Sequence, residues 1–347
     1  MSLFDPARLF GLAHPVIQAP MAGVSTPALA AAVANAGGMG SLGIGAASVE
    51  AARQMIEETR AKTSGLFSVN MFCHAPARRD AAVEAGWIDQ LRPFFSEFDA
   101  APPTDLQEIY RSFVEDEAAF RMLLATAPPV VSFHFGLPPR DWIAAFRAAG
   151  IGTMATATNP QEAQAIEAAG VEVIVAQGTE AGGHRGVFDP EAHDPALSMP
   201  VLVSQLVQRT RLPVVAAGGI MQGREIKAAL TLGAAAAQLG TAFVLCPESA
   251  ADAAYRAVLK SDQARDTRFT SAISGRPARG IANRLARFEG GPVPAYPVAY
   301  DAGKALHAAA KARGDHGFAA HWAGQGSPLA REAPAGDMVR TLVAEAA

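Results

Sequence analysis

The stretch VIQAPMAGVSTPALAAAVANAGGMGSLG, residues 16–43, contains one complete strand–helix–strand unit. Its first residues, 16–21, form a short apolar run, and in residues 26–37 the apolar positions recur at three- and four-residue spacing. That spacing is typical of a helix, and the glycine at its end is a common helix terminus. A second short run, residues 38–43, follows directly. The unit therefore predicts two parallel strands joined by a helix.

The same alternation continues along most of the chain. Further helical segments, residues 159–170 and 222–233, also end at glycine, and Asn159 before Pro160 is a good helix start. The remaining predicted strands are residues 66–72, 130–136, 152–157, 171–178, 213–219 and 235–244. Several of them are apolar or small at successive positions, which fits strands buried on both faces. We predict an α/β fold, a (β/α)8 TIM barrel. A doubly wound sheet is the alternative, but no GxGxxG motif opens a helix after the first strand.

Two long regions interrupt the alternation and predict a smaller, mainly helical cap built from two excursions. Long segments beside a barrel mouth usually carry functional covers or extra helices. The predicted organisation is residues 1–75 for barrel strands one to three, 76–128 for the first cap excursion, 129–260 for strands four to eight, 261–315 for the second cap excursion, and 316–347 for a C-terminal helical segment that returns to the barrel.

Composition limits the classes of partner. The chain has 347 residues, of which 50% are hydrophobic, and a net charge of −4 with scattered Lys and Arg. This pattern favours neither a nucleic-acid partner nor an anionic membrane. The opening residues lack the apolar core of a signal peptide, so we expect a cytoplasmic protein. Cys73 and Cys246 show no metal-ligand spacing, so we expect reduced thiols and no metal.

Amide side chains stand where three of the predicted strands end. Asn70, Gln177 and Gln238 can each donate and accept hydrogen bonds. In parallel α/β proteins the carboxyl ends of the strands form the site. Such a set suits a flat ring with a polar edge, such as the pyrimidine edge of an isoalloxazine, better than a metal ion.

Glycine-rich segments follow the last two predicted strands. They are AAGGIMQGREI, residues 216–226, and QLGTAF, residues 238–243. Barrels often bind phosphate at these two loops, because backbone N–H groups and a helix N-terminus approach the phosphate oxygens there. The alternative is that each loop is simply a tight turn between strand and helix.

Among eight histidines, His184 is the candidate general base. Glycines on both sides leave it accessible, and a histidine with a near-neutral pKa suits proton transfer. The alternative is a loop histidine steadied by Glu180 or Arg185. His134 lies on a predicted strand as a second site candidate or a core histidine. We expect surface or packing roles for His14, His193, His307, His316 and His321. The sequence shows no GxSxG or HExxH pattern, and His74 beside Cys73 would point to the opposite face of a strand, so we expect no nucleophile pair there.

Taken in order along the chain, these motifs resemble the flavin-dependent nitronate monooxygenases, once called 2-nitropropane dioxygenases, and particularly their class I. The resemblance covers nearly the whole chain. It rests on residues 15–43, 131–139 (VSFHFGLPP), 176–188 (AQGTEAGGHRGVF), 213–226, 236–249, 274–285 (SGRPARGIANRL) and 321–332 (HWAGQGSPLARE). It implies an FMN held non-covalently at the barrel mouth.

The resemblance also implies roles for individual residues. The FMN ring and its chain would meet Ala19, Pro20, Met21, Asn70, Gln177 and Gly182, and the ribityl phosphate would meet Gly218, Gly219, Gln238, Gly240 and Thr241. His184 would be the catalytic base, and His134 would stand on the other side of the substrate.

All four tyrosines of the chain fall in segments predicted to cover the barrel. In the resemblance, Tyr110, Tyr255, Tyr296 and Tyr300 line the substrate pocket, and Lys304 attracts an anionic nitronate. The spacing 296, 300, 304 places three of these residues on one helix face, provided that the helix includes Pro297. Ordinary packing of the tyrosines is the alternative.

The implied reaction is oxidative denitrification of an alkyl nitronate, such as propionate 3-nitronate, by O2 without NAD(P)H. Small-molecule nitronates or nitroalkanes and O2 are then the partners, and the protein is a monomer or a homodimer. Two alternatives stay open: a flavin-type enoyl-ACP reductase that uses NADH, which shares the glycine–histidine loop, and a flavin-binding protein without turnover.

Overall fold

The computed structural model describes Asp5 and residues 9–347, and within them a sheet of eight parallel strands curls into a nearly closed barrel. The strands lie in the order β1-β9-β8-β6-β5-β4-β3-β2, and a parallel bridge between Ile17 and Met39 joins the two end strands. Their bounds are β1 (Val16–Gln18), β2 (Gly40–Gly43), β3 (Phe67–Phe72), β4 (Val130–His134), β5 (Gly152–Ala157), β6 (Val173–Gln177), β8 (Val214–Ala217) and β9 (Ala236–Leu239). The predicted TIM barrel is confirmed, with each strand inside its predicted range.

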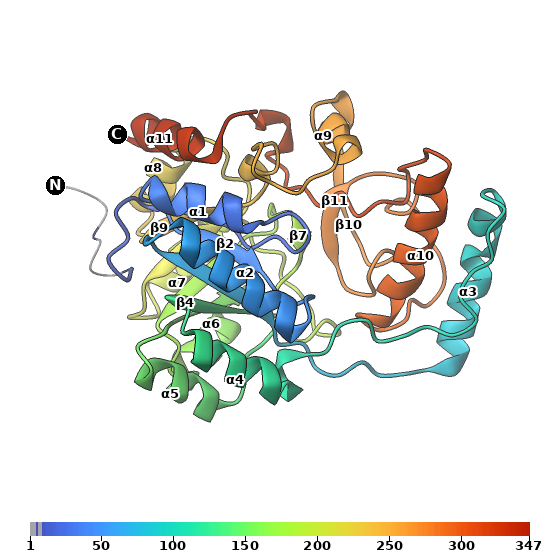
Figure 1. The fold of residues 1–347 in the computed structure, drawn as a ribbon, viewed down its shortest axis with the longest axis horizontal. Coiled ribbons are helices and arrows are strands. Elements are labelled where there is room, and N and C mark those ends of the chain that lie inside the picture. Colours follow the sequence, from blue (N-terminus) through green and yellow to red (C-terminus); the bar gives the residue numbers. More distant parts are fainter. Residues whose placement is uncertain (1–4, 6–8) are drawn as a thin grey trace.

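Helices surround the barrel (Figure 1). They are α1 (Pro27–Asn35), α2 (Val49–Lys62), α4 (Glu117–Thr126), α5 (Arg140–Ala148), α6 (Pro160–Ala169), α7 (Met199–Val207), α8 (Gly223–Thr231) and the C-terminal α11 (Ala335–Ala346). Local sequence explains their ends. The Asn159 side chain accepts from the backbone N–H of Glu162 at the start of α6, and Gly170 ends this helix in the left-handed conformation.

Close packing of α1 on the barrel depends on Gly40 of β2. A Cβ atom at this position would lie 2.0 Å from the carbonyl oxygen of Ala30 in α1. Only glycine allows the helix backbone to approach the strand so closely. The glycines of the opening sequence therefore set the distance between helix and strand.

The barrel interior is apolar at the amino ends of the strands and polar at their carboxyl ends. One buried cluster joins Leu9 and Leu12 to the interior side chains of the strands, among them Ile17, Met154 and Val215. Above this layer lie polar side chains of the strand ends, namely Asn70, Ser132, Thr156, Gln177 and Gln238. The apolar layer closes one end of the barrel and leaves a polar opening at the other.

A cap lies beside this opening, where α3 (Ala81–Ser96) and α10 (Val298–Ala312) pack against each other at the far end from the barrel helices (Figure 1). Trp87 and Leu91 of α3 are buried against Leu306 of α10 and Phe318. The rest of the first excursion returns to the barrel, because Phe113 in η2 (Phe113–Glu115) and the buried face of α4 join the barrel core. Only part of residues 76–128 therefore lies in the cap.

The cap also contains β-structure that the sequence analysis did not predict. Strands β10 (Thr267–Thr270), β11 (Ala278–Ile281) and β7 (Gly183–His184) form a small antiparallel sheet. This pairing joins segments about ninety residues apart, so local patterns do not reveal it. Short helices complete the description, namely η3 (Thr241–Phe243), α9 (Ala253–Leu259), η4 (Asp262–Arg265) and η5 (Ser327–Leu329). In the described part of the chain, every helix is too short or too polar to cross a membrane.

Candidate active site at the barrel mouth

A cavity of about 850 Å³ opens at the carboxyl ends of the barrel strands and extends under the cap. The structure brings all of the predicted site residues together in its lining. From the barrel come Ala19, Pro20, Met21, Asn70, His134, Gln177, Gly182, His184, Gly218, Gly219, Gln238, Gly240 and Thr241, and from the covering segments come Tyr110, Tyr255, Tyr296, Tyr300 and Lys304. Its volume is within the range typical of small-molecule and cofactor sites.

His184 is held in this cavity by strand pairing. It lies opposite Ala278 in the β7–β11 pair, and its ring Nε2 is 2.9 Å from the hydroxyl oxygen of Ser274. Aromatic rings surround the imidazole, with the ring centres of Trp322 and Tyr296 at 5.3 Å and 5.4 Å. The sequence did not point to Ser274 as the partner.

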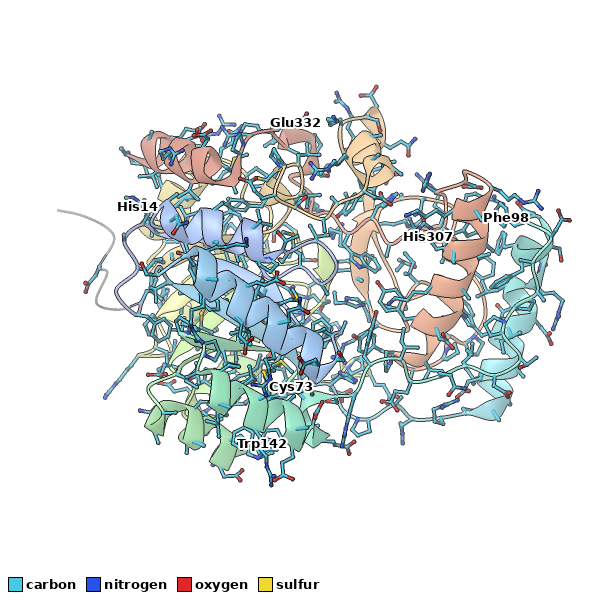
Figure 2. All side chains as sticks on the ribbon, in the orientation of Figure 1. His14, Cys73, Phe98, Trp142, His307 and Glu332 are labelled. Carbon is cyan, nitrogen blue, oxygen red and sulfur yellow. The ribbon has the colours of Figure 1, made fainter. Side chains whose placement is uncertain are left out.

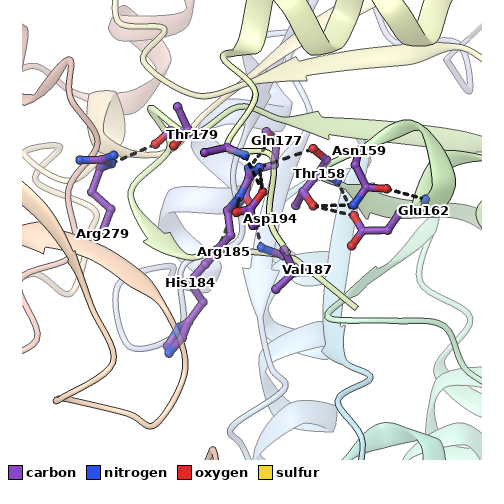
Figure 3. A network of polar contacts seen from close by, with 12 residues as sticks. Thr158, Asn159, Glu162, Gln177, Thr179, His184, Arg185, Val187, Asp194 and Arg279 are labelled. Carbon is purple, nitrogen blue, oxygen red and sulfur yellow. Dashed lines mark hydrogen bonds and ion pairs between the residues drawn. The ribbon is translucent and has the colours of Figure 1, made fainter. Parts of the chain in front are cut away.

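Neither residue expected as a possible partner of His184 contacts it. Arg185 points to the opposite side of the strand, where it forms an ion pair with Asp194 at 2.7 Å (Figure 3). The carboxylate of Glu180 accepts from the backbone N–H of Met199. Because strand neighbours point to opposite faces, Arg185 stabilises the loop while the His184 ring faces the cavity. The interpretation that Glu180 or Arg185 steadies the imidazole is wrong.

The surroundings keep the His184 imidazole neutral. Burial lowers its pKa from 6.5 to about 3, and the positive charge of Arg276 acts in the same direction. Arg276 is itself 3% exposed, and its guanidinium lies 4.4 Å from the centre of the Phe135 ring. The pKa of His184 thus lies below the near-neutral value expected from the sequence, and at neutral pH the uncharged ring has a lone pair that can accept a proton.

His134 uses both ring nitrogens to hold protein groups. Its Nδ1 is 3.0 Å from the hydroxyl oxygen of Thr156, and its Nε2 is 3.2 Å from the carbonyl oxygen of His184. Because a carbonyl can only accept, Nε2 carries the proton and donates, and Nδ1 accepts from the threonine. Burial lowers the pKa of His134 to about 4, so this ring is also neutral. Its contacts make it a support for the His184 loop.

The amides at the strand ends differ in what they bind. Gln177 binds the loop: Nε2 donates to the His184 carbonyl at 3.0 Å, and Oε1 accepts from the Gly186 N–H at 2.8 Å. Asn70 donates to the Ser132 hydroxyl at 2.9 Å. The Gln238 side chain makes no hydrogen bond with any described residue, and it is open to a ligand in the cavity.

Glycines form the loops after β8 and β9, beside the strand ends. Gly218 and Gly219 have φ angles of 122° and 71°, which side chains rarely adopt. A Cβ atom at Gly240 would have the Ala19 Cβ as its nearest neighbour, at 3.6 Å. The Thr241 hydroxyl accepts from the Gly324 N–H at 3.0 Å. A Cβ atom at Gly218 or Gly219 would lie 3.2 Å from Ala181 N or Glu180 Cβ, so Gly240 is the position of these three where a ligand has room to approach the backbone.

The tyrosines and Lys304 form the cap side of the cavity. Tyr300 and Lys304 lie one turn apart on α10, and the Lys304 amino group is 4.7 Å from the Tyr110 ring centre and 5.3 Å from that of Tyr300. Tyr296 precedes α10, whose N-cap is Pro297. The condition for placing three residues on one helix face is therefore not met, because Pro297 stands at the start of the helix and Tyr296 lies outside it.

Several residues of the cavity wall were missed by the sequence analysis. Trp322 lines the cavity, and so do His307 and His321, which were expected only on the surface or in packing. Burial lowers the pKa of His321 to about 4, and its ring stacks on Tyr255 at 4.9 Å. The motifs at residues 274–285 and 321–332, on which the family resemblance partly rests, could have pointed to this part of the wall. Neither motif indicates which of its side chains face the cavity.

The thiols lie outside this site. Cys73 and Cys246 are free and buried, and neither lines the cavity. Burial raises the pKa of both thiols, that of Cys246 to about 12. They are therefore uncharged packing groups at neutral pH.

Comparison with known proteins assigns the family. The family model described as nitronate monooxygenase matches residues 7–345. The chain belongs to the nitronate monooxygenase family. This family is flavin-dependent and acts on small molecules with O2.

Individual relatives cover nearly the whole chain. The nitronate monooxygenase of Pseudomonas aeruginosa is 56% identical over 343 residues, 97% of each chain. That of Paraburkholderia phytofirmans is 57% identical over 341 residues, 97% of this chain and 93% of the relative. The crystal structure of nitroalkane oxidase from Streptomyces ansochromogenes superposes with a TM-score of 0.89 at 41% identity, covering 96% of this chain and 95% of that one. Sequence and structure thus agree on one family.

Proposed function

We propose that this protein is an FMN-dependent nitronate monooxygenase that converts alkyl nitronates, such as propionate 3-nitronate, with O2 into a carbonyl compound plus nitrite or nitrate. The observation that carries the proposal is the gathering in one cavity of a neutral histidine, the Gln238 amide, the glycine loops after β8 and β9, and Lys304 with its tyrosines, in a chain from this family. No NAD(P)H is needed in this reaction.

The residues present fit an FMN at the barrel mouth. The Gln238 amide, which makes no hydrogen bond within the described part of the chain, can donate to and accept from a polar ring edge, and the apolar side chains of Ala19 and Met21 can contact the ring face. The loops that contain Gly218, Gly219 and Gly240 follow the last two barrel strands, where barrels commonly hold phosphate. When bound, the flavin supplies the electron transfer from substrate to O2. The protein supplies binding, orientation and proton control.

His184 is proposed to remove the α-proton of a neutral nitroalkane. Its imidazole is neutral at pH 7 and lines the cavity, so it has the protonation state that a base needs. Breaking the C–H bond places the proton on the ring, and the electron pair moves onto the nitro oxygens to give the nitronate. The name of the Streptomyces relative, nitroalkane oxidase, supports action on neutral substrates.

Lys304 is proposed to attract the nitronate anion. No described carboxylate forms an ion pair with its amino group, and burial lowers its pKa while Asp301 raises it. An unpaired cation between two tyrosine rings can hold an anion beside the aromatic wall. Burial raises the pKa of Tyr110 to about 12 and that of Tyr300 further, so both phenols stay neutral and can donate hydrogen bonds to the anion.

The two alternatives from the sequence have less support. A flavin-type enoyl-ACP reductase requires NADH, whereas relatives that are 56% and 57% identical over nearly the full chain are nitronate monooxygenases. A flavin-binding protein without turnover does not explain an accessible neutral histidine in the cavity. A neutral histidine in the cavity favours catalysis.

The assignment of His184 as the base is tested by His184→Asn, with His193→Asn at an exposed position as the matched control. We expect turnover of neutral nitroethane to fall by about 10²-fold or more, because general base catalysis contributes at least this factor. Activity on preformed ethylnitronate should fall much less. If nitroethane turnover survives at the level of the control, His184 is not the base.

A further inference from the structure

The imidazole of His184 has a single hydrogen-bond partner among the described residues, the hydroxyl of Ser274. The Nε2–Oγ distance is 2.9 Å, and Ser274 is fully buried. The same hydroxyl oxygen lies 3.2 Å from the carbonyl oxygen of Arg276, to which it donates. The Ser274 hydroxyl therefore connects a titratable ring to a group that can only accept.

Counting protons selects one tautomer of His184. With the proton on Nε2, the ring donates to Ser274 and the hydroxyl donates to the Arg276 carbonyl, so both contacts are hydrogen bonds. With the proton on Nδ1, the hydroxyl must donate to Nε2, and the Arg276 carbonyl loses its donor. Because an unsatisfied buried acceptor is unfavourable, the first arrangement is the more stable.

We propose that Ser274 is a positioning residue that fixes the neutral His184 ring with its proton on Nε2, so that Nδ1 is the atom that accepts the substrate proton. Nδ1 makes no hydrogen bond with the described residues. It is also not fully buried, because the fully buried polar atoms without a partner among these residues do not include it. Nδ1 is therefore accessible, and the space that His184 lines is the cavity. The inference rests on the proposed role of His184 as the base.

The position of Ser274 is itself fixed by the segment that follows it. The N–H of Arg185 donates to the Pro277 carbonyl at 2.8 Å, next to the pairing of His184 with Ala278. The Arg276 guanidinium donates to the carbonyl of Val187, beyond the histidine. Residues on both sides of His184 are thus bound to the segment that carries the serine. The serine hydroxyl and the ring are held together by this pairing.

The tautomer decides where the proton goes in the reaction. The substrate C–H bond breaks, an N–H bond forms at Nδ1, and the electron pair moves onto the nitro group. The resulting imidazolium keeps its Nε2–H bond to Ser274. A ring with its proton on Nδ1 would instead present a donor to the cavity and would have no lone pair for the substrate.

The direct test is nitrogen NMR of the flavin-loaded protein with 15N-labelled histidine, with the His184 signals assigned by their loss in His184→Asn. We expect a protonated, pyrrole-type nitrogen at Nε2 and an unprotonated, pyridine-type nitrogen at Nδ1 between pH 6 and 8. The reverse assignment, or a ring protonated on both nitrogens at pH 7, overturns the proposal. This measurement needs no serine variant and does not depend on turnover.

The serine is then tested by Ser274→Ala, with Ser271→Ala in the same segment as control and Ser274→Thr as the variant that keeps the hydroxyl. We expect mixed tautomers in Ser274→Ala and a fall of about tenfold in kcat/KM for nitroethane, with less than threefold change for ethylnitronate. Ser274→Thr should restore the single tautomer. An unchanged His184 spectrum in Ser274→Ala contradicts the proposal.

The two proposals fail in different ways. If His184→Asn retains turnover of nitroethane, the base assignment fails, whatever the tautomer. If His184→Asn loses turnover while Ser274→Ala leaves the tautomer of His184 unchanged, the base assignment holds and the role of Ser274 fails.

Discussion

The side chain of Gln177 binds the backbone of His184: its Nε2 donates to the histidine carbonyl at 3.0 Å, and its Oε1 accepts from the Gly186 N–H. A residue at the end of a barrel strand therefore holds the loop that presents the candidate base. Figure 3 shows Gln177 beside this loop, with the His184 ring directed away from the Arg185–Asp194 pair. The position of the imidazole thus depends on contacts of its backbone as well as its ring.

Replacing Gln177 by Ala removes both contacts. We expect kcat/KM to fall by about 10²-fold, because a displaced catalytic group loses productive geometry. The free energy of unfolding should fall by ~1–3 kcal/mol, since the buried Gly186 N–H loses its acceptor. Steady-state kinetics and urea unfolding check these values against Gln161→Ala, an exposed position on α6. Equal kinetics in the two variants would contradict this role.

Gln238→Ala tests the open amide of the cavity. Because its side chain makes no hydrogen bond with the described residues, its removal should leave the free energy of unfolding of the flavin-free protein nearly unchanged. The Kd for FMN should rise by about tenfold, equivalent to roughly 1.4 kcal/mol. Fluorescence titration of the flavin-free protein measures this change, again with Gln161→Ala as control. An FMN affinity equal to that of the control would exclude Gln238 from the flavin site.

Lys304→Met tests the attraction of an anion to the cap wall. The Lys304 amino group lies over the Tyr110 and Tyr300 rings. Removing its charge should raise KM for ethylnitronate by about tenfold and should change KM for neutral nitroethane less than twofold. Lys62→Met, at an exposed position on α2, is the control. Equal effects on both substrates would show that Lys304 acts by packing and not by charge.

His74 should make the protein less stable in acid. This ring is 1% exposed, neither ring nitrogen has a hydrogen-bond partner among the residues that the structure describes, and burial together with Arg276 lowers its pKa to about 4. Between pH 7 and pH 5 the unfolded state, with a histidine pKa near 6.5, binds more protons than the folded state. Stability therefore falls as the pH falls, by about 2 kcal/mol at pH 5 from this group.

The measurement is urea unfolding of wild type and His74→Leu at pH 7 and pH 5. The loss of stability on acidification should be about 2 kcal/mol smaller in the variant. His74 follows Cys73 in the sequence, and Figure 2 shows the side chains around Cys73, where the chain passes from the barrel to the cap. His193→Leu, at an exposed position, should show the wild-type loss. An identical loss in His74→Leu would contradict the neutral state of this ring.

The barrel and its cavity could be predicted because local patterns determine both. Apolar runs and helices that end at glycine mark each unit, and parallel strands bring residues as distant as Asn70 and Gln238 to one edge. The contacts inside the site could not be predicted in this way. The pairing of β7 with β11 and the bond from His184 to Ser274 join segments about ninety residues apart. Pro297 excludes Tyr296 from α10, so the condition attached to the spacing of residues 296, 300 and 304 is not met.

The most direct test of the proposed function is anaerobic mixing of the flavin-loaded protein with propionate 3-nitronate and, separately, with NADH, while flavin absorbance is recorded. We predict a rapid change in the flavin spectrum with the nitronate and none with NADH on the same timescale. Rapid reduction by NADH with no response to the nitronate would contradict the proposed function and would favour the reductase alternative.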